Sequence, residues 1–327
     1  MTDHWQAVAL SRHVGRKPKR VLFGGVPVVL FRDHAGQVAA LHDRCPHRFA
    51  RLSEGRVQNG EIECPYHGWR FSGAGRCTAI PGLMDDLPKV RLRRFTVCEA
   101  EGAVFVSGGT PEAAPYVHCL QGQAVITRRV TSSTRSTLID TAENILDATH
   151  THFTHKGLLR GLSAKRYAVS VAVTGGPGWV EACYTGEDRA QGLISKLLEG
   201  ERVRTIGRYR HPGIAELEYW GPKGIVLATT FHLRQADADR VEGIGWLMGP
   251  KQGGFGHLKA LAFKPMFRIA LEQDRRVLSS AKQNAALAPV AKPVIGPLDF
   301  LREDIARIEA GALPRAATEP KSYRIEL

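Results

Sequence analysis

Two short segments combine cysteine with histidine at spacings that suit metal ligation. Cys45 and His47 form a C-x-H pattern, and Cys64 and His67 form a C-x2-H pattern, with a proline after each cysteine. A typical zinc finger instead takes its cysteines from one segment and its histidines from another. Mixed halves suit a two-iron cluster with two thiolates on one iron and two imidazoles on the other. The pattern therefore predicts a [2Fe–2S] cluster, with a structural zinc site or a chance arrangement as alternatives.

A second group of possible ligands lies in residues 144–155. Two histidines and a carboxylate can hold Fe(II) on one face and leave positions open for O2 and substrate. The stretch contains Asp147, His150, His152 and His155. On an ideal helix His152 and His155 are closer neighbours than His150 and His155, because side chains three apart share a face. Spacing alone therefore leaves the histidine pair open, and a chance polar stretch is a further alternative.

A facial iron site needs a third ligand, which must come from a distant part of the chain. Asp274 follows Glu272 in a segment whose apolar residues recur with helical spacing, so it can project from a helix. Its alternative role is a surface ion pair with Lys282 or Arg268. The other acidic candidates are Asp237, Asp239, Glu242, Glu272, Asp299 and Glu303.

The first third of the chain carries the pattern of a small all-β domain. Short apolar runs alternate with turn signals, and residues 108–115 are rich in glycine, proline and alanine. We therefore expect a linker there and domains at 1–115 and 116–327. The expected strands of the first domain include residues 20–23, 26–31 and 38–41 and two stretches within 90–106.

The second domain is expected to be α+β, with one large antiparallel sheet and helices outside it. A helix signal covers 140–148, and a helical pattern from His257 should break at Pro265. A last helix is expected at about 298–310, and the tail after Pro314 shows no clear element. The expected strands span residues 167–173, 179–184, 216–220, 225–233 and 240–248.

The two cysteine–histidine segments resemble the Rieske domain of bacterial ring-hydroxylating oxygenases. In respiratory Rieske proteins two further cysteines of these loops form a disulfide, and Ala50 and Tyr66 stand at the corresponding positions here. Their absence favours the lower-potential cluster of the oxygenases. By this resemblance the cluster ligands are Cys45, His47, Cys64 and His67.

Residues 144–155 resemble the N-x2-D-x2-H-x4-H motif of the same family. The resemblance assigns His150 and His155 as ligands of a mononuclear Fe(II) and leaves His152 at the surface or beside a ligand. The family's third ligand lies in an E-x-D segment of a C-terminal helix, which Asp274 matches. The resemblance thus implies a complete two-histidine, one-carboxylate site.

Asp147 and Asn144 match two further positions of the family motif. The family's bridging aspartate joins an iron-ligating histidine of one subunit to the Rieske histidine of the next. Asp147 would accordingly connect His150 to His67 of the partner subunit and couple electron transfer to the iron; otherwise it is a helix-surface residue. Asn144 would lie beside the iron, where it could touch O2 or the metal, unless it caps a neighbouring backbone group.

The resemblance covers nearly the whole chain and implies a terminal oxygenase acting on an apolar or aromatic small molecule, in aromatic catabolism. It also implies a second domain of the helix-grip, START-like kind. The chain is short for the family and resembles its homotrimeric monooxygenases and demethylases of the dicamba, vanillate or 3-ketosteroid type. Hydroxylation or oxidative demethylation is therefore expected, with cis-dihydroxylation by a dioxygenase as the alternative.

Electrons must reach the cluster from another protein, because the chain has no flavin or nicotinamide signature. A ferredoxin, a flavin reductase using NAD(P)H, or both would supply them. A rival hypothesis is a Rieske electron carrier whose second domain holds no iron. The net charge of +13 over 327 residues suits an acidic electron donor. It does not indicate nucleic-acid binding, because the densest basic run, residues 12–20, contains no aromatic residue.

The remaining composition fits a globular protein of the cytoplasm. No apolar run approaches the roughly 20 residues of a membrane span, and the first residues lack the order of a signal peptide. The six cysteines are too few for a disulfide scaffold. The substrate pocket is expected to be apolar. Its candidate residues are Leu158, Leu159, Leu193, Ile194, Leu197, Phe231 and Trp246.

Overall fold

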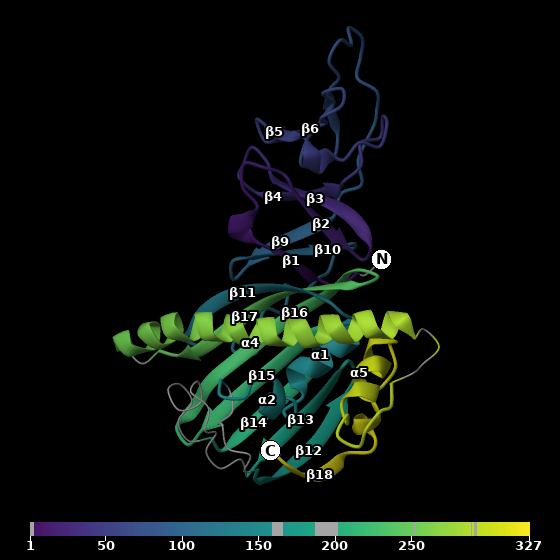
Figure 1. The fold of residues 1–327 in the computed structure, drawn as a ribbon. Helices are drawn as coiled ribbons and strands as arrows, with labels where there is room; N and C mark the ends of the chain where they lie inside the picture. The colour runs from purple at the N-terminus through teal and green to yellow at the C-terminus, as the bar shows by residue number, and fades with distance from the viewer. Residues whose placement is uncertain (1–2, 159–165, 187–201, 252, 289, 291–292) are drawn as a thin grey trace. The chain divides into compact units, whose positions relative to one another are not determined.

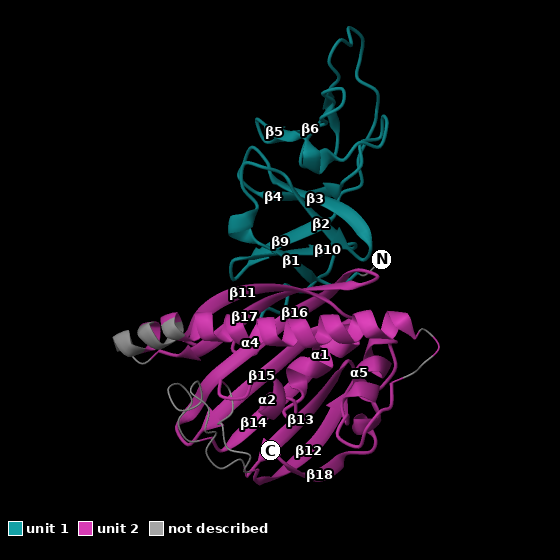
Figure 2. Ribbon diagram, viewed as in Figure 1, with its two compact units in different colours: residues 1–117 teal, residues 118–327 magenta. Residues whose placement is uncertain are grey.

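The computed structural model describes residues 3–158, 166–186, 202–251, 253–288, 290 and 293–327 (Figure 1). The chain divides into two compact units, residues 1–117 and residues 118–327 (Figure 2). Each unit has a buried apolar core of its own. Within the described residues, no helix is both long enough and apolar enough to cross a bilayer.

Unit 1 is all-β, as the alternation of short apolar runs and turns predicts, and its strands form three small antiparallel sheets. The loop that contains Cys45 follows strand β4, and the loop that contains Cys64 lies between β6 and β7. Both cysteines belong to the core beneath these loops. The sheets are β1 (Gln6–Leu10), β10 (Ala103–Ser107) and β9 (Thr96–Ala100); β2 (Lys19–Phe23), β3 (Val26–Arg32) and β4 (Val38–His42); and β5 (Arg56–Gln58), β6 (Glu61–Glu63), β7 (Arg70–Phe71) and β8 (Cys77–Ala79).

Unit 2 is built on one eight-stranded sheet whose neighbouring strands are all antiparallel. Buried and exposed residues alternate along β12, as expected for a strand with one face on the core, whereas β16 and β17 contain runs of consecutive buried residues. In spatial order the strands are β11 (Val125–Arg135), β17 (Arg240–Pro250), β16 (Gly224–Asp237), β15 (Ile214–Gly221), β14 (Arg204–Arg210), β13 (Trp179–Thr185), β12 (Ala168–Gly176) and β18 (Lys321–Glu326).

Helices cover one face of this sheet, and the long helix α4 (Gly253–Leu287) crosses it (Figure 1). Helix α1 (Leu138–Leu146) is capped at its N-terminus by Thr137, whose side chain accepts a hydrogen bond from the Asp140 amide. A one-turn helix, α2 (Thr151–Thr154), follows it, and α5 (Arg302–Glu309) precedes the last strand. Residues of α4 and α5 share one core with the sheet.

The expectation that Pro265 ends a helix is wrong. Proline 265 lies inside α4, on the exposed side of the helix, so water can reach the carbonyl that its missing N–H would have engaged.

The tail after Pro314 also departs from the expectation, because it forms the edge strand β18 on β12. Strand β14 has no counterpart among the expected strands. Its sequence contains three arginines, and Arg208 is tolerated on the sheet because Glu181 and Glu216 pair with it.

Candidate metal centres

The two cysteine–histidine loops of unit 1 have the same backbone hydrogen bonds. The amide of Cys45 donates to Ala50, and that of Cys64 donates to Trp69, both at 2.8 Å. The fifth residue of each loop, Phe49 or Gly68, donates back to the cysteine carbonyl and has a positive φ of 60° or 69°. That conformation is strained for a non-glycine residue such as Phe49, so the surrounding structure holds both loops in one shape.

The loops bury their cysteines and expose their histidines. Cys45 and Cys64 are 1% and 3% exposed, whereas His47 and His67 lie at the surface with ring centroids 4.6 Å apart. The His47 ring stacks on Trp69 at 4.9 Å. Burial raises the pKa of Cys45 to about 11, so this sulfur needs a metal cation to become a thiolate. The residues therefore fit a cluster with a buried thiolate side and an exposed imidazole side.

In the described part of unit 2, one compact group of three side chains can hold a metal ion. Its members are His150, His155 and Asp274. The two histidine Nε2 atoms are 3.3 Å apart, and Asp274 Oδ1 lies 3.5 Å from His150 Nε2 and 3.1 Å from His155 Nε2. Ligand atoms bonded at about 2.1 Å and at right angles to each other lie roughly 3 Å apart, so this triangle fits one face of an octahedral ion.

The break between α1 and α2 explains how residues five apart meet. Helix α1 ends at Leu146, and His150 and His155 cap the two ends of α2. A continuous helix would have directed these two side chains to different faces. His152, which ideal helical spacing favoured, does not belong to the group of three.

The carboxylate of Asp274 also passes a test of fit. While both Nε2 atoms carry no proton, its buried Oδ1 atom has no hydrogen-bond donor among the described residues. A buried, unsatisfied carboxylate oxygen is unfavourable, and a cation at the centre of the triangle would satisfy it. The donor set of two imidazoles and one carboxylate suits non-heme Fe(II).

A neighbouring side chain faces the other nitrogen of each imidazole. Gln273 Oε1 lies 2.8 Å from His155 Nδ1, and Asp147 Oδ2 lies 3.4 Å from His150 Nδ1. Each contact favours a proton on Nδ1 and leaves the Nε2 lone pair for a metal. Sequence reasoning missed Gln273, although its place between Glu272 and Asp274 in the E-x-D segment was visible.

Replacing Gln273 with leucine should weaken the affinity of unit 2 for Fe(II) by about 10–100-fold, because His155 loses the acceptor that orients it. Equilibrium titration with Fe(II) under anaerobic conditions measures the change. Gln273→Glu retains an acceptor and should bind iron nearly as well as the unsubstituted chain. Equal affinity in the leucine variant would contradict the orienting role.

The electrostatics of the group favour one positive charge at its centre. Burial lowers the pKa of His150, but the Asp147 and Asp274 carboxylates outweigh burial and raise that pKa to about 9. Burial opposes ionisation of Asp274, yet the two imidazoles hold its pKa below the usual range. A proton supplies the charge when no metal is bound, and a divalent cation can replace it.

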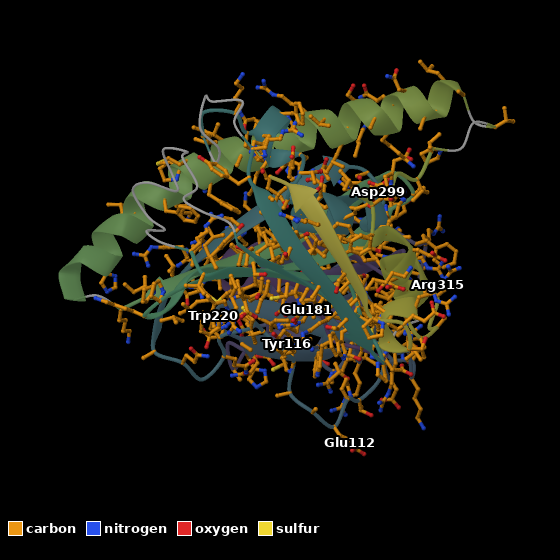
Figure 3. All side chains as sticks on the ribbon, turned by 90° about the horizontal axis from the view of Figure 1, so that it is seen from below. Glu112, Tyr116, Glu181, Trp220, Asp299 and Arg315 are labelled. Carbon is orange, nitrogen blue, oxygen red and sulfur yellow. The ribbon has the colours of Figure 1, made fainter. Side chains whose placement is uncertain are left out.

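The other acidic candidates for the third ligand are engaged elsewhere. Lys282, a possible partner of Asp274, pairs with Asp239 instead. Arg315, the partner of Glu303, lies beside α5 at the edge of unit 2 (Figure 3). The remaining contacts are Asp237 with Arg240, Glu242 with Arg234, Glu272 with Arg275 and Arg276, and Asp299 with the Gly296 amide.

A pocket of about 110 Å³ opens beside the group of three. Asn144 and Asp147 line it, and so does Phe231, as expected. Trp246 is wrong as a pocket residue, since it is fully buried against His232, and Leu158 packs against the core. The other four expected pocket residues, Leu159, Leu193, Ile194 and Leu197, lie outside the described residues. The apolar part of the lining comes mainly from Ile145, Leu146, Tyr184, Leu217, Tyr219, Leu227, Phe231, Phe263, Phe267, Ala270 and Leu271.

Known proteins match part of the chain by sequence and nearly all of it by fold. Residues 4–96 match the family model of the Rieske [2Fe-2S] domain. The 4beta-methylsterol monooxygenase of Methylococcus capsulatus is 41% identical over 117 residues, which are 34% of this chain and 32% of that protein. The oxygenase component of dicamba O-demethylase from Stenotrophomonas maltophilia is 39% identical over 111 residues, 34% of this chain and 33% of its own. The chain thus spans about a third of the length of these relatives.

Among solved structures, dicamba monooxygenase bound to 3,6-dichlorosalicylic acid has a TM-score of 0.80 at 22% identity, over 94% of this chain and 96% of its own. The same protein with non-heme iron and dicamba has a TM-score of 0.74 at 21% identity, over 94% and 95%. The expected fold class, a small all-β cluster domain followed by a large antiparallel sheet with helices, is therefore confirmed.

Proposed function

We propose that this chain, which has the Rieske [2Fe–2S] domain and the fold of a Rieske oxygenase, is the terminal oxygenase component of a multicomponent enzyme. The observation that carries the proposal is the convergence of His150, His155 and Asp274 beside an apolar pocket, in a chain that also holds a Rieske domain. A carrier of electrons needs only the cluster. An oxygenase needs both centres.

The cluster would be held by Cys45, His47, Cys64 and His67, and the mononuclear iron by His150, His155 and Asp274. When bound, these groups supply single electrons and the activation of O2, respectively. Asp147 orients the His150 ring, and Asn144 lies at the pocket wall. The apolar lining excludes water and holds the substrate next to the metal face that protein ligands leave open.

The reaction we favour inserts one oxygen atom, as hydroxylation or oxidative demethylation of an apolar or aromatic small molecule. The names of two relatives, a 4beta-methylsterol monooxygenase and a dicamba O-demethylase, support this choice over cis-dihydroxylation. The product distinguishes the two reactions, because only a dioxygenase leaves both atoms of one O2 molecule in it.

Electrons would enter unit 1 at the exposed histidines. Phe49 and Tyr66 lie in the same two loops and are 63% and 58% exposed, and such exposed aromatic surface suits a docking partner. A ferredoxin or a flavin reductase that takes electrons from NAD(P)H is the partner we propose, and the excess of cations favours an acidic one. Electron transfer between the two centres would occur in a homotrimer. Electrons would pass from the Rieske cluster of one subunit, through Asp147 of the next subunit, to that subunit's mononuclear iron. The six free cysteines support work in a reducing compartment such as the cytoplasm.

Iron content tests the proposal directly. The oxygenase predicts about three iron atoms per chain and O2 uptake with a surrogate reductase and a panel of aromatic substrates. About two iron atoms per chain, without O2 uptake, would support the electron carrier instead.

His152→Ala should change iron content and turnover by less than about two-fold, because the group of three does not include this histidine. Iron analysis and O2 uptake check the result, with His155→Ala as the matched variant that should lose both. Loss of iron in His152→Ala would show that the wrong histidine pair has been assigned.

A further inference from the structure

Pairing between strands places Thr229 and Tyr219 together on the floor of the pocket. Strands β15 and β16 direct alternate side chains towards the helices, and paired residues lie side by side on that face. Tyr219 pairs with Leu227, and Leu217 pairs with Thr229. Thr229 is therefore a diagonal neighbour of Tyr219.

The hydroxyl of Thr229 is buried and unsatisfied. Thr229 is 1% exposed, and its Oγ1 atom has no hydrogen-bond partner among the residues described. The side chain shares a strand face with Leu227 and Phe231, and all three line the pocket. Burying an unpaired hydroxyl is unfavourable, and valine would fill the same space without it. The hydroxyl is therefore placed to bind a group that enters the pocket.

Arg202 brings a positive charge to the same end of the pocket. It lines the pocket, and its guanidinium lies over the Tyr219 ring, 4.4 Å from the ring centroid. Stacking orients the planar guanidinium while its N–H groups remain directed outward in the plane. Since Tyr219 adjoins Thr229, the Arg202 guanidinium and the Thr229 hydroxyl lie near the same part of the pocket.

The pocket lining carries charges of both signs. Asp274 belongs to the group of three and Asp147 faces His150, whereas Arg202 lies over Tyr219 of β15. An anionic substituent is repelled by the carboxylates and attracted by the guanidinium. A substrate with one anionic end would therefore present its apolar end to the metal centre.

Given the proposed oxygenase function, we propose that Thr229 and Arg202 determine substrate specificity by binding an anionic oxygen group, a carboxylate in the first instance. The guanidinium supplies the charge and the hydroxyl donates a hydrogen bond to the same group. The apolar part of the substrate fills the remainder of the pocket.

Calorimetric titration of the full-length, iron-loaded chain tests this proposal with two probes of nearly equal shape, 4-methoxybenzoate and 4-methoxybenzamide. The acid should bind at least about ten-fold tighter than the amide, as charge-assisted hydrogen bonds require. Arg202→Gln should abolish this preference, and Thr229→Val should weaken binding of the acid by about ten-fold.

Two matched variants serve as controls. Arg204→Gln removes the same charge from an arginine that stacks on Trp220 (labelled in Figure 3) at 4.9 Å. Trp220 follows Tyr219 in β15, so its side chain points to the opposite face of the sheet. Thr174→Val removes an exposed hydroxyl of β12. Both should leave binding of the acid unchanged. Equal affinity of the unsubstituted chain for acid and amide would overturn the proposal, and so would an equal loss in Arg204→Gln.

Failure of this proposal is distinguishable from failure of the oxygenase function, because the titration needs no reductase and no turnover. Selective binding of the acid without O2 uptake from any substrate would contradict the oxygenase and keep the binding site. O2 uptake with neutral substrates, without preference for the acid, would contradict the binding site and keep the oxygenase.

Discussion

Asp274→Ala should remove the mononuclear iron and lower turnover by more than about 100-fold, while the visible spectrum of the Rieske cluster stays unchanged. The reason is that Asp274 supplies the sole carboxylate of the group of three, and even residues behind a metal ligand contribute about 10–100-fold to affinity. The cluster loops belong to the separate core of unit 1. Iron analysis, absorption spectroscopy and O2 uptake together measure the effect.

Glu272→Ala is the matched control on the same helix. Glu272 pairs with Arg275 and Arg276 at the surface, so its loss should alter iron content and turnover by less than about two-fold. Asp274→Asn preserves the shape of the side chain and serves as a second test in case the alanine variant does not fold. If the Asp274 variants have the iron content and activity of the unsubstituted chain, the assignment of Asp274 as a metal ligand is wrong.

Asp147→Asn should keep both metals and slow electron transfer to the mononuclear iron by about 10–100-fold. The Asp147 carboxylate receives hydrogen bonds from the Thr149 amide and hydroxyl at 2.6 Å and 2.7 Å, and its other oxygen faces His150 Nδ1 at 3.4 Å. An amide can still accept from Thr149 with its oxygen. Its NH2 group would then face the imidazole, which needs an acceptor there.

Stopped-flow reoxidation of the reduced cluster in the presence of substrate and O2 measures this step. Reduction of the cluster by its donor should be unaffected, because the substitution lies in unit 2. Thr149→Val keeps the Asp147 carboxylate and removes one hydrogen-bond donor to it, so the rate of cluster reoxidation should fall by less than about five-fold. If the cluster of Asp147→Asn is reoxidised, and the variant turns over, at the rates of the unsubstituted chain, Asp147 has no bridging role.

Local sequence patterns predicted much of the fold. Strands β2, β3, β4, β9 and β10 were predictable because short apolar runs and turn residues report backbone conformation locally, whereas β1 and the short strands β5 to β8 were not among the predicted strands. Strand β14 was not among the predicted strands. Its three arginines stand at alternate positions on one face, and the pairing of Arg208 with Glu181 and Glu216 of the neighbouring strands is not visible in a local pattern. Strand β18 likewise depends on the open edge of β12.

The sequence by itself determined the donor chemistry of this protein: two cysteine–histidine loops and a histidine-rich stretch, each confined to a few consecutive residues. Tertiary structure decided the rest. The end of α1 at Leu146 selects His150 over His152, and α4 carries Gln273 to His155 across 118 residues of sequence. The same packing places Thr229 and Arg202 on the pocket floor. Spacing within a segment reflects only local geometry, whereas contacts between distant segments depend on how the helices pack on the sheet.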